Sequence, residues 1–166
     1  MQDFVHLHVH TQYSLLDGQA SVARLVDKAM QNGMKGIAVT DHGNMFGIKE
    51  FTNYVNKKNS GPKGEIKDLK KRLVGIEAGS IECEDKEAEV AACKAKIVEA
   101  ENKLFKPIIG CEMYVARRTM DLKEGKQDQS GYHLIVLAKN ETGYHNLIKL
   151  VSHAWTRGYY MRPRTD

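Results

Sequence analysis

The sequence predicts an α/β fold with a largely parallel sheet. Short apolar runs, typical of buried strands, alternate along the chain with longer segments whose apolar residues recur at helical spacing. The resulting order is strand, helix, strand, helix, strand, strand, helix, which is the pattern of α/β proteins. A chain of 166 residues with 42% hydrophobic and 28% charged residues is large enough for one domain with its own core.

The segment at residues 4–10, "FVHLHVH", is predicted to be the first strand. Side chains alternate between the two faces of a strand, so His6, His8 and His10 share one face while valine and leucine occupy the other. A face of imidazoles requires hydrogen-bond partners, water or metal. Purification tags are contiguous and lack this alternation, whereas hydrogen-bonded core histidines are an open alternative. Three such histidines ahead of Asp17 favour metal binding.

Two helices and a strand are expected next. Apolar residues at helical spacing predict a helix over residues 21–33, with Ser21 as its N-cap and Gly33 as its stop. The run "GIAVT" at residues 36–40 has the character of a buried strand. The loop "DHGNMFG" follows it, and a second helix is expected over residues 45–56.

The carboxyl-terminal part of the chain repeats this alternation. "KPIIGCEMYVA" at residues 106–116 is strand-like and rich in β-branched residues, and "YHLIVLA" at residues 132–138 is predicted to be another buried strand. "TGYHNLIKLVSHAW" at residues 142–155 closes the pattern as a helix with an apolar side.

A strongly charged segment at residues 60–104 interrupts the pattern. Its apolar residues step by three and four positions, which is the narrow seam of coiled-coil packing. The seam residues are Ile66, Leu69, Leu73 and Ile76, followed by Val90, Cys93, Ile97, Ala100 and Leu104. The prediction is an inserted antiparallel helical hairpin that turns near Gly79, with its charged faces in water, acting as a structural or partner-binding arm.

Composition narrows the setting of the protein. No apolar run reaches the length of about 18 residues that spans a bilayer, and the amino terminus lacks the basic and apolar stretches of a secretory signal. The three cysteines are widely spaced and form no CxxC pair, so no disulfide framework is expected. We therefore expect a cytoplasmic protein without a membrane partner.

The end of the chain, "TRGYYMRPRTD", interleaves Arg157, Arg162 and Arg164 with two tyrosines. Such a mixture is most often a solvated surface or an interdomain contact, and it also suits phosphate binding and base stacking. A net charge of +4 is too mild to indicate nucleic-acid binding by itself.

Candidate metal ligands gather at or near the predicted strand ends, where the sites of α/β folds form. They are His8, His10, Asp17, His42, Glu112 and His133. His133 is the exception because it begins its strand, which either an antiparallel strand or a misplaced boundary would explain. Imidazoles and carboxylates together suit zinc, manganese or iron, and six ligands exceed the four of one tetrahedral zinc, so two or more ions are expected. Paired ions activate water and clamp a phosphoryl group, so the predicted chemistry is phosphoester hydrolysis by a metal-bound hydroxide.

Four stretches carry a family resemblance: "HLHVHTQYSLLDG", "GIAVTDHGNMFG", "KPIIGCEMYVA" and "YHLIVLAKNETGYHNLIKLVS". Together they resemble the amino-terminal PHP (polymerase and histidinol phosphatase) domain of bacterial replicative DNA polymerase III alpha subunits. The resemblance covers residues 4–57 and 105–166. The phrases "SLLDG", "TDHGN" and "TGYHNL" favour the polymerase branch over free-standing histidinol phosphatases.

This resemblance implies a PHP-type distorted β/α barrel that holds two or three divalent metal ions. The motif positions of the family fall on the same six candidate ligands. His6 then lies one step deeper in the barrel, where it supports the ligands or packs, and Asp41 orients a neighbouring side chain instead of binding metal.

The chain departs from the family pattern in two respects. The family's later ligands, a cysteine and a closing D-x-H pair, have no counterpart before Asp166, so residues 1–166 resemble the amino-terminal part of an incomplete PHP domain. A partial barrel exposes strand edges and apolar surface, so self-association is expected. The second departure is the inserted hairpin at about 60–104.

For the whole protein, the resemblance implies a DNA-directed DNA polymerase of DNA replication that works on DNA with other replication subunits. Within it, the leading hypothesis for this domain is metal-dependent phosphoesterase or 3′–5′ exonuclease chemistry. One alternative is a structural scaffold that binds a proofreading partner, and another is a free-standing small-molecule phosphatase. Residues for nucleotidyl transfer are expected beyond this segment.

Overall fold

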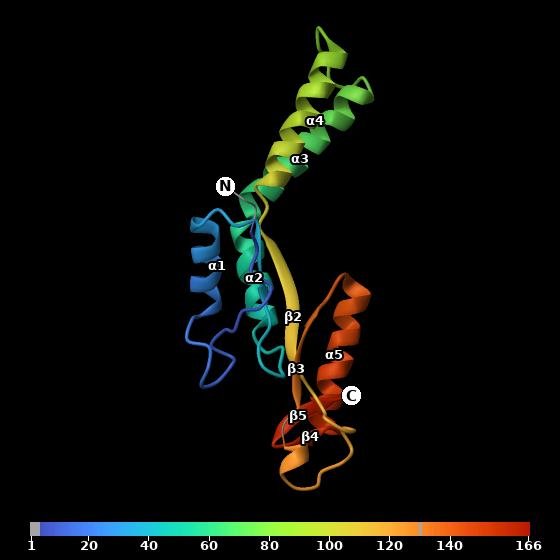
Figure 1. The fold of residues 1–166 in the computed structure, drawn as a ribbon. Helices are drawn as coiled ribbons and strands as arrows, with labels where there is room; N and C mark the ends of the chain where they lie inside the picture. The colour runs from blue at the N-terminus through green and yellow to red at the C-terminus, as the bar shows by residue number, and fades with distance from the viewer. Residues whose placement is uncertain (1–3, 130) are drawn as a thin grey trace. The chain divides into compact units, whose positions relative to one another are not determined.

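A computed structural model describes residues 4–129 and 131–166 of the chain (Figure 1). Its helices and strands are α1 (Val22–Gln31), β1 (Gly36–Val39), α2 (Ile48–Lys58), α3 (Ser60–Glu77), α4 (Lys86–Asn102), β2 (Lys106–Val115), the 3₁₀ helix η1 (Lys126–Asp128), β3 (Tyr132–Leu137), α5 (Glu141–Thr156), β4 (Tyr159–Tyr160) and β5 (Arg162–Thr165). The chain forms two compact units, one ending at Tyr54 and resuming at Lys106, the other comprising Val55–Phe105. The predicted α/β fold is confirmed, and two helices, α3 and α4, stand where the sequence predicts a helical hairpin.

The sheet of the first unit is built around β2. β1 pairs with β2 in parallel, from Gly36 opposite Lys106 to Val39 opposite Ile109. β5 also pairs with β2 in parallel, whereas β3 runs antiparallel to β2 and β4 runs antiparallel to β5. The sheet is therefore mixed, because antiparallel strands join the parallel pairs that the sequence predicts.

Alternation along β2 separates a packing face from a polar face. Cys111 and Met113 are almost fully buried and pack with residues of α5 in one apolar cluster. The α5 residues in this cluster are Leu147, Val151 and Ala154, which follow helical spacing. Glu112 and Tyr114 point to the opposite face of β2, so the register of one strand fixes which side chains are available to a site.

The prediction of a strand over residues 4–10 is wrong. The segment runs beside β1 with only two backbone bonds to it, from Ala38 N to the His6 carbonyl and from Thr40 N to the Val9 carbonyl, each 2.9 Å. A bend at residues 7–8 interrupts the extended chain and leaves Leu7 exposed. The ladder is too sparse for a strand, and the expected burial of one whole face fails with it.

The helices lie close to their predicted places. Ser21 caps α1 by accepting a hydrogen bond from Arg24 N, as expected. α2 begins later than predicted because Asn44 Oδ1 accepts a hydrogen bond from Phe46 N and holds the preceding residues in a turn. Within residues 4–129 and 131–166, no helix is both long and apolar enough to cross a membrane.

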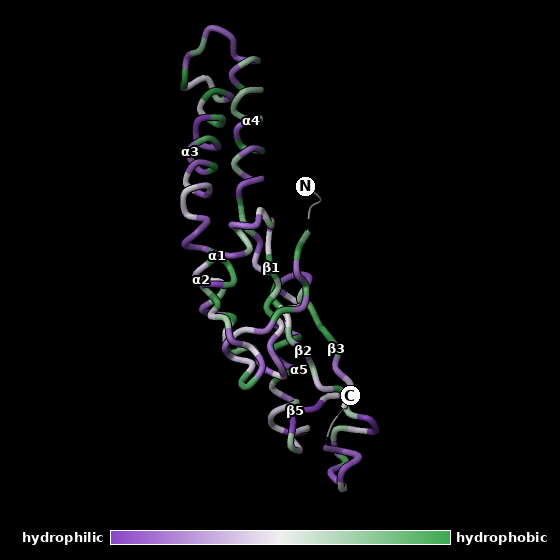
Figure 2. The backbone as a smooth tube through the Cα atoms, turned by 60° about the vertical axis from the view of Figure 1, so that its left-hand side comes forward, coloured by the Kyte–Doolittle hydropathy of each residue, from purple (hydrophilic) through white to green (hydrophobic). Residues whose placement is uncertain are grey.

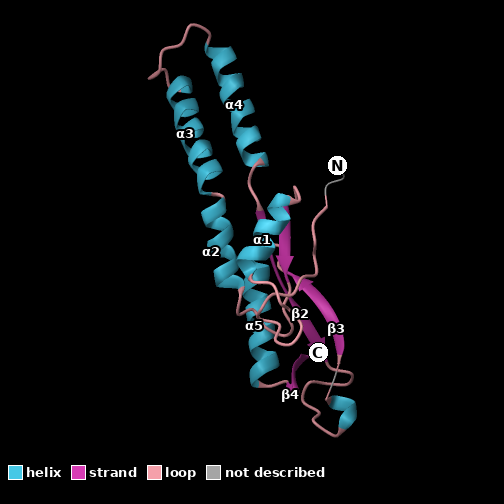
Figure 3. Ribbon diagram, turned by 90° about the vertical axis from the view of Figure 1, so that its left-hand side faces the viewer, coloured by secondary structure: helices cyan, strands magenta, loops and turns pink. Residues whose placement is uncertain are grey.

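The second unit is a pair of helices, α3 and α4, that lie side by side in Figures 1 and 3. The predicted seam contains the buried apolar residues of these two helices, among them Ile66 and Ile76 of α3 and Ile97 of α4. At its base, Asn59 and Phe105 exchange two hydrogen bonds: Asn59 Nδ2 donates to the Phe105 carbonyl at 2.8 Å, and Phe105 N donates to Asn59 Oδ1 at 3.0 Å.

The prediction that β3 is buried is wrong: its first three residues are exposed and its last three are only partly buried. Figure 2 colours much of β3 as hydrophobic, yet Tyr132 and Leu134 are exposed. β3 pairs with β2 alone among the described strands, so one of its edges lies open.

β4 and β5 were not expected from the sequence, because arginine and tyrosine suggested a surface segment. Arg164 of β5 is fully buried and donates to the carbonyl oxygens of Gly158, Met120 and Leu122 at 3.1, 2.9 and 3.0 Å. These bonds offset the cost of burying a guanidinium and fix the loop that precedes η1 against the end of the chain.

Candidate metal centre

The amino-terminal segment reaches the site along β1. Backbone bonds to Ala38 and Thr40 place residues 6–9 beside that strand, and Val9 N also donates to Thr40 Oγ1 at 2.9 Å. His8 and His10 therefore arrive where β1 ends. The sequence predicts both histidines at the end of their own strand; the segment is not a strand, but both histidines lie beside the carboxyl end of β1.

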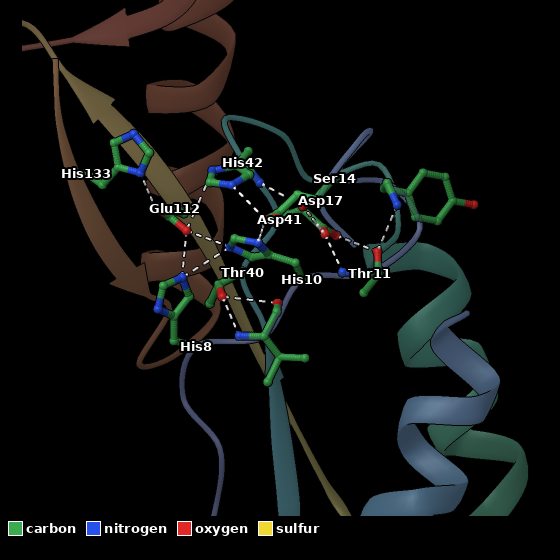
Figure 4. Close-up of polar contacts among 12 residues, drawn as sticks. His8, His10, Thr11, Ser14, Asp17, Thr40, Asp41, His42, Glu112 and His133 are labelled. Atoms are coloured by element: carbon green, nitrogen blue, oxygen red, sulfur yellow. Dashed lines mark hydrogen bonds and ion pairs between the residues drawn. The ribbon is translucent and has the colours of Figure 1, made fainter. Parts of the chain in front are cut away.

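The chain after β1 continues the parallel pairing by one more bridge, between His42 and Glu112. Glu112 N donates to the Asp41 carbonyl at 3.0 Å, and Gly43 N donates to the Glu112 carbonyl at 2.8 Å. The two backbones are thereby held together on both sides of Glu112, whose side chain shares one face of the sheet with the His42 ring (Figure 4).

The antiparallel course of β3 explains the one misplaced candidate. His133 is the second residue of β3 and lies opposite Tyr114 in the register. Because β3 runs against β2, its beginning meets the carboxyl end of β2, two residues past Glu112. The antiparallel alternative for this strand is therefore correct.

Glu112 lies at the centre of the histidine cluster in Figure 4. Its Oε2 is 2.6 Å from His8 Nε2 and 2.6 Å from His10 Nε2, and its Oε1 contacts His133 Nδ1. The Glu112 side chain is only 4% exposed. Four histidines surround this buried carboxylate, since His42 Nδ1 is 3.6 Å from the same Oε2.

Asp17 supplies a second carboxylate at the outer side of the cluster. Its Oδ2 contacts His10 Nδ1 and lies 3.0 Å from His42 Nε2. His10 therefore has one ring nitrogen toward Asp17 and the other toward Glu112. The Asp17 side chain is about half exposed, so this side of the cluster is open to solvent.

The carboxylates and histidines of the cluster shift one another's pKa. Burial raises the pKa of Glu112, but hydrogen bonds from His8, His10 and His133 outweigh it and lower this pKa to about 2. The hydrogen bond to His10 lowers the pKa of Asp17. Burial lowers the pKa of His10, yet its bonds to both carboxylates give a net rise. Both acids are therefore ionised at neutral pH.

The donor set fits divalent metal ions. One ligand atom from each of three residues lies within 4.8 Å of the others in the groups His8–His10–Glu112, His10–Asp17–His42 and His42–Glu112–His133. In the described part of the chain, His42 Nδ1 is a buried nitrogen without a hydrogen-bond partner. A buried imidazole nitrogen beside an ionised carboxylate is an arrangement that a metal ion satisfies. All six predicted ligands are thus brought together, and their role as ligands stays a prediction.

Asp41 supports the cluster from behind. It is buried and accepts hydrogen bonds from Thr11 N at 2.7 Å, from Thr11 Oγ1 at 2.8 Å and from Ser14 Oγ at 2.6 Å. Ser14 Oγ in turn accepts from His42 N at 3.2 Å. Through Ser14, Asp41 therefore ties the loop that carries Asp17 to the backbone of His42, which is the arrangement that an orienting residue requires.

His6 lies apart from the described cluster. It is exposed, and its ring packs edge-on against Phe4 with centroids 4.7 Å apart. The bend at residues 7–8 breaks the alternation that would have aligned His6 with His8 and His10.

Tyr114 belongs to the site although the sequence analysis did not select it. Its ring stacks on His42 at 5.8 Å with an interplanar angle of 14° and meets His133 edge-on at 4.9 Å. Its position two residues after Glu112 in a strand was a usable signal, because residues i and i+2 share a face.

A scan against family models matches the PHP domain to residues 6–166. Among curated proteins, the chain is 39% identical over 166 residues to DNA polymerase III subunit alpha of Borreliella burgdorferi, which covers 98% of this chain and 10% of the relative. It is 40% identical over 164 residues to the protein of the same name from Treponema pallidum, with the same coverage. The corresponding values for Aquifex aeolicus are 33% over 171 residues, 99% and 11%. The chain thus spans about a tenth of the length of these relatives.

Proposed function

Because this chain belongs to the PHP domain family, we propose that it forms the amino-terminal part of a metal-dependent phosphoesterase domain. The observation that carries the proposal is the convergence of four histidines, from three chain segments, on the buried carboxylate of Glu112. The predicted ligands are His8, His10, Asp17, His42, Glu112 and His133, and the predicted ions are two or three of zinc, manganese or iron.

A cluster of ion pairs without metal is the competing interpretation. It requires protonated histidines, and neighbouring imidazolium rings repel one another: His8 Nε2 and His10 Nε2 are only 3.1 Å apart. Divalent ions instead bind neutral imidazole together with ionised carboxylate, and the low pKa of Glu112, about 2, keeps its carboxylate ionised. The donor chemistry therefore favours metal.

Bound divalent ions would supply Lewis acidity and an activated water for attack on a phosphorus centre. The residues of this chain provide the frame. Glu112 offers both carboxylate oxygens toward the histidines, and Asp17 offers Oδ2 on the open side. Asp41 holds Thr11 and Ser14 and so fixes the loop that carries Asp17. A phosphoester would enter from the solvent side, where Asp17 and His8 are exposed.

For the whole protein we propose the activity named for its relatives, that of a DNA polymerase III alpha subunit. This includes DNA as the substrate, other replication subunits as partners and a cytoplasmic setting. The support is the identity of 33–40% across nearly the whole chain to three proteins of that name. Residues 1–166 would then be the amino-terminal part of the PHP domain, with the hairpin at about 60–104 as an insertion.

A scaffold role is the second candidate. The predicted ligands come from the segment beside β1, the loops around β1, and the strands β2 and β3, so a bound ion would cross-link parts of the chain that are distant in sequence. In that case metal serves stability, and the domain supports the polymerase or a proofreading partner without hydrolysing phosphoesters.

The test is metal content and phosphodiester hydrolysis in the protein as it is encoded, comparing His10→Ala with His145→Ala. His145 lies on α5 and is exposed, so it is a matched control. We expect His10→Ala to lose bound metal and to hydrolyse single-stranded DNA at least about tenfold more slowly, while His145→Ala behaves as wild type.

Two outcomes would count against the proposal. Wild-type protein without stoichiometric divalent metal overturns the metal centre itself. Metal that is bound and lost on His10→Ala, together with a lower unfolding temperature but no hydrolysis in the metal-loaded wild type, establishes the scaffold role in place of the phosphoesterase.

A further inference from the structure

An aromatic groove lies directly beside the candidate metal centre. It has a volume of about 340 Å³, within the range of small-molecule sites, and His42 belongs both to its lining and to the histidine cluster. Phe46, Trp155 and Tyr159 contribute their rings, and all three are exposed, with Phe46 at 67%. These rings adjoin the candidate metal centre, so a substrate held at that centre would meet them.

The rings of this groove form an ordered platform. Trp155 and Tyr159 stack with centroids 5.6 Å apart and an interplanar angle of 18°, and Phe46 lies 6.3 Å from Trp155. The indole N–H of Trp155 donates to the carbonyl oxygen of Gly43 at 2.7 Å. Because Gly43 directly follows His42, this bond fixes the indole relative to the cluster.

Backbone strain is concentrated at the edges of the groove. Among residues 4–129 and 131–166, Leu16 and Met161 are the non-glycine residues with positive φ, at 69° and 62°. Met161 lines the groove and is 65% exposed, and Leu15, the neighbour of Leu16, lines it as well. A disfavoured backbone that presents an apolar side chain to solvent is typical of functional sites.

A cation lies in the same lining. Arg162 Nη1 donates to the Tyr114 hydroxyl at 3.0 Å, and its guanidinium lies 5.3 Å over the Tyr114 ring. A guanidinium has five N–H donors, so this contact leaves donors for a phosphate oxygen. Aromatic faces beside an arginine and a phosphoester-cleaving centre match a nucleotide, whose base stacks while its phosphate is neutralised.

We propose that this groove binds a nucleobase of single-stranded nucleic acid, stacked on Trp155 and Tyr159, so that the adjoining phosphoester lies at the histidine cluster. The inference rests on the proposed phosphoester chemistry and narrows its substrate to nucleotides over aliphatic phosphates. Arg162 would hold a flanking phosphate, and Met161 and Phe46 would close over the base.

Trp155 makes the groove directly observable, because it is the single tryptophan among these 166 residues. The experiment uses the encoded protein in the presence of a chelator, so that no hydrolysis occurs. The emission of Trp155 is isolated as the difference between wild type and Trp155→Phe. The probes are a short oligothymidylate and an abasic oligomer of the same length.

We expect oligothymidylate to quench Trp155 emission and the abasic oligomer to leave it unchanged. Tyr159→Ala should weaken this binding about tenfold, because it removes one stacking surface, while Tyr144→Ala on α5 should not. Equal quenching by both oligomers, or none, overturns the proposal. Failure of acrylamide to quench Trp155 also overturns it, since another part of the protein then covers the groove.

The outcome is separable from that of the phosphoesterase proposal. His10→Ala should slow metal-dependent hydrolysis at least about tenfold and leave the quenching by oligothymidylate intact. Quenching without hydrolysis in the metal-loaded wild type would refute the phosphoesterase and retain the base-binding groove. Hydrolysis without quenching would refute the base-binding groove and retain the phosphoesterase.

Discussion

His42 and Glu112 face each other across a parallel bridge that extends the pairing of β1 with β2 beyond the end of β1. Bonds between the two backbones on both sides of Glu112 fix the register of this contact. The position of the central carboxylate is therefore set by the sheet, while the histidines around it come from the amino-terminal segment, from the loop after β1 and from β3.

Replacing Glu112 with glutamine tests whether the carboxylate organises the cluster. The amide keeps the shape of the side chain but carries no charge and has one acceptor oxygen in place of two. His8, His10 and His133 all contact this carboxylate, so we expect metal content to fall at least about tenfold. Loss of residues that hydrogen-bond metal ligands lowers metal affinity by a similar factor. Elemental analysis of the purified protein measures it.

Glu141→Gln is the matched control, because Glu141 is 90% exposed at the start of α5. Equal metal content in the wild type and in Glu112→Gln would refute the organising role of the Glu112 carboxylate.

Asp41→Asn addresses the support behind the ligands. The asparagine amide cannot accept every bond that Asp41 accepts from Thr11 and Ser14, so one buried donor loses its partner. We expect metal affinity to drop by about 10- to 100-fold and the free energy of unfolding to fall by about 1–3 kcal/mol. Metal titration and urea denaturation measure the two effects. Asp68→Asn, on an exposed position of α3, should change neither, and an unaltered affinity in Asp41→Asn would show that Asp41 has no orienting role.

Gly43→Ala tests the turn between the cluster and Trp155. Gly43 has a φ of 60°, and an added Cβ would lie 2.7 Å from Pro163 Cγ and 3.1 Å from Tyr114 Cε2. We expect the free energy of unfolding to fall by about 1–3 kcal/mol. Gly64→Ala, inside α3 with open space around it, should instead stabilise by about 0.5–1 kcal/mol. The two unfolding curves should shift in opposite directions, and a shared direction would contradict the assignment of strain to Gly43.

Acid sensitivity is expected from Asp128. Its hydrogen bonds from Arg118 lower the pKa of this buried carboxyl below the usual value. A pKa that is lower in the folded state than in the unfolded state means that the stabilisation is complete above the unfolded pKa, near about 4, and is lost as the pH falls through the folded pKa. Asp128→Asn should therefore flatten the loss of unfolding free energy below about pH 4.

Asp121→Asn is the comparison for that pH series. Asp121 is also paired with an arginine, Arg157, but both side chains are at least half exposed, so salt screens the pair. Addition of salt should reduce the change in unfolding free energy caused by Asp121→Asn. It should leave most of the change caused by Asp128→Asn. Identical salt dependence would contradict the difference in burial.

The hairpin should be removable without loss of the metal centre. Asn59 and Phe105 lie within hydrogen-bond distance, so a linker of a few glycine and serine residues can replace residues 60–104. All six predicted ligands lie in the other unit, and we expect metal content to be unchanged. Loss of metal in the shortened protein would refute the proposed insertion.

In the intact chain, Asn59→Ala should cost about 1–3 kcal/mol of unfolding free energy, because buried backbone groups of Phe105 lose their partners.

The sequence predicted which residues could act as ligands, but it predicted poorly which distant segments of the chain lie next to one another. The spacing of His8 and His10, and the strands that end near His42 and Glu112, could be recognised from alternation and apolar runs. The register that places His133 against Glu112 could not, because it depends on the antiparallel course of β3, and no short-range pattern encodes strand direction.

Two errors have a common physical origin. Residues 4–10 have strand-like alternation but only two backbone bonds to β1, and β5 has a surface-like composition but pairs with β2 and buries Arg164. Whether a segment becomes a strand depends on the neighbours that satisfy its backbone groups, and these neighbours are far away in sequence. The groove formed by Phe46 and Trp155 was missed for the same reason, since its rings come from separate segments.

The closed base of the hairpin has a consequence for how this protein can change over time. Since the chain leaves and returns through one pair of residues, Asn59 and Phe105, whole helical turns can be added to α3 and α4 or removed from them together without shifting the strands on either side. The arm is thus a point at which the chain can gain or lose length while the sheet that carries Glu112 keeps its register.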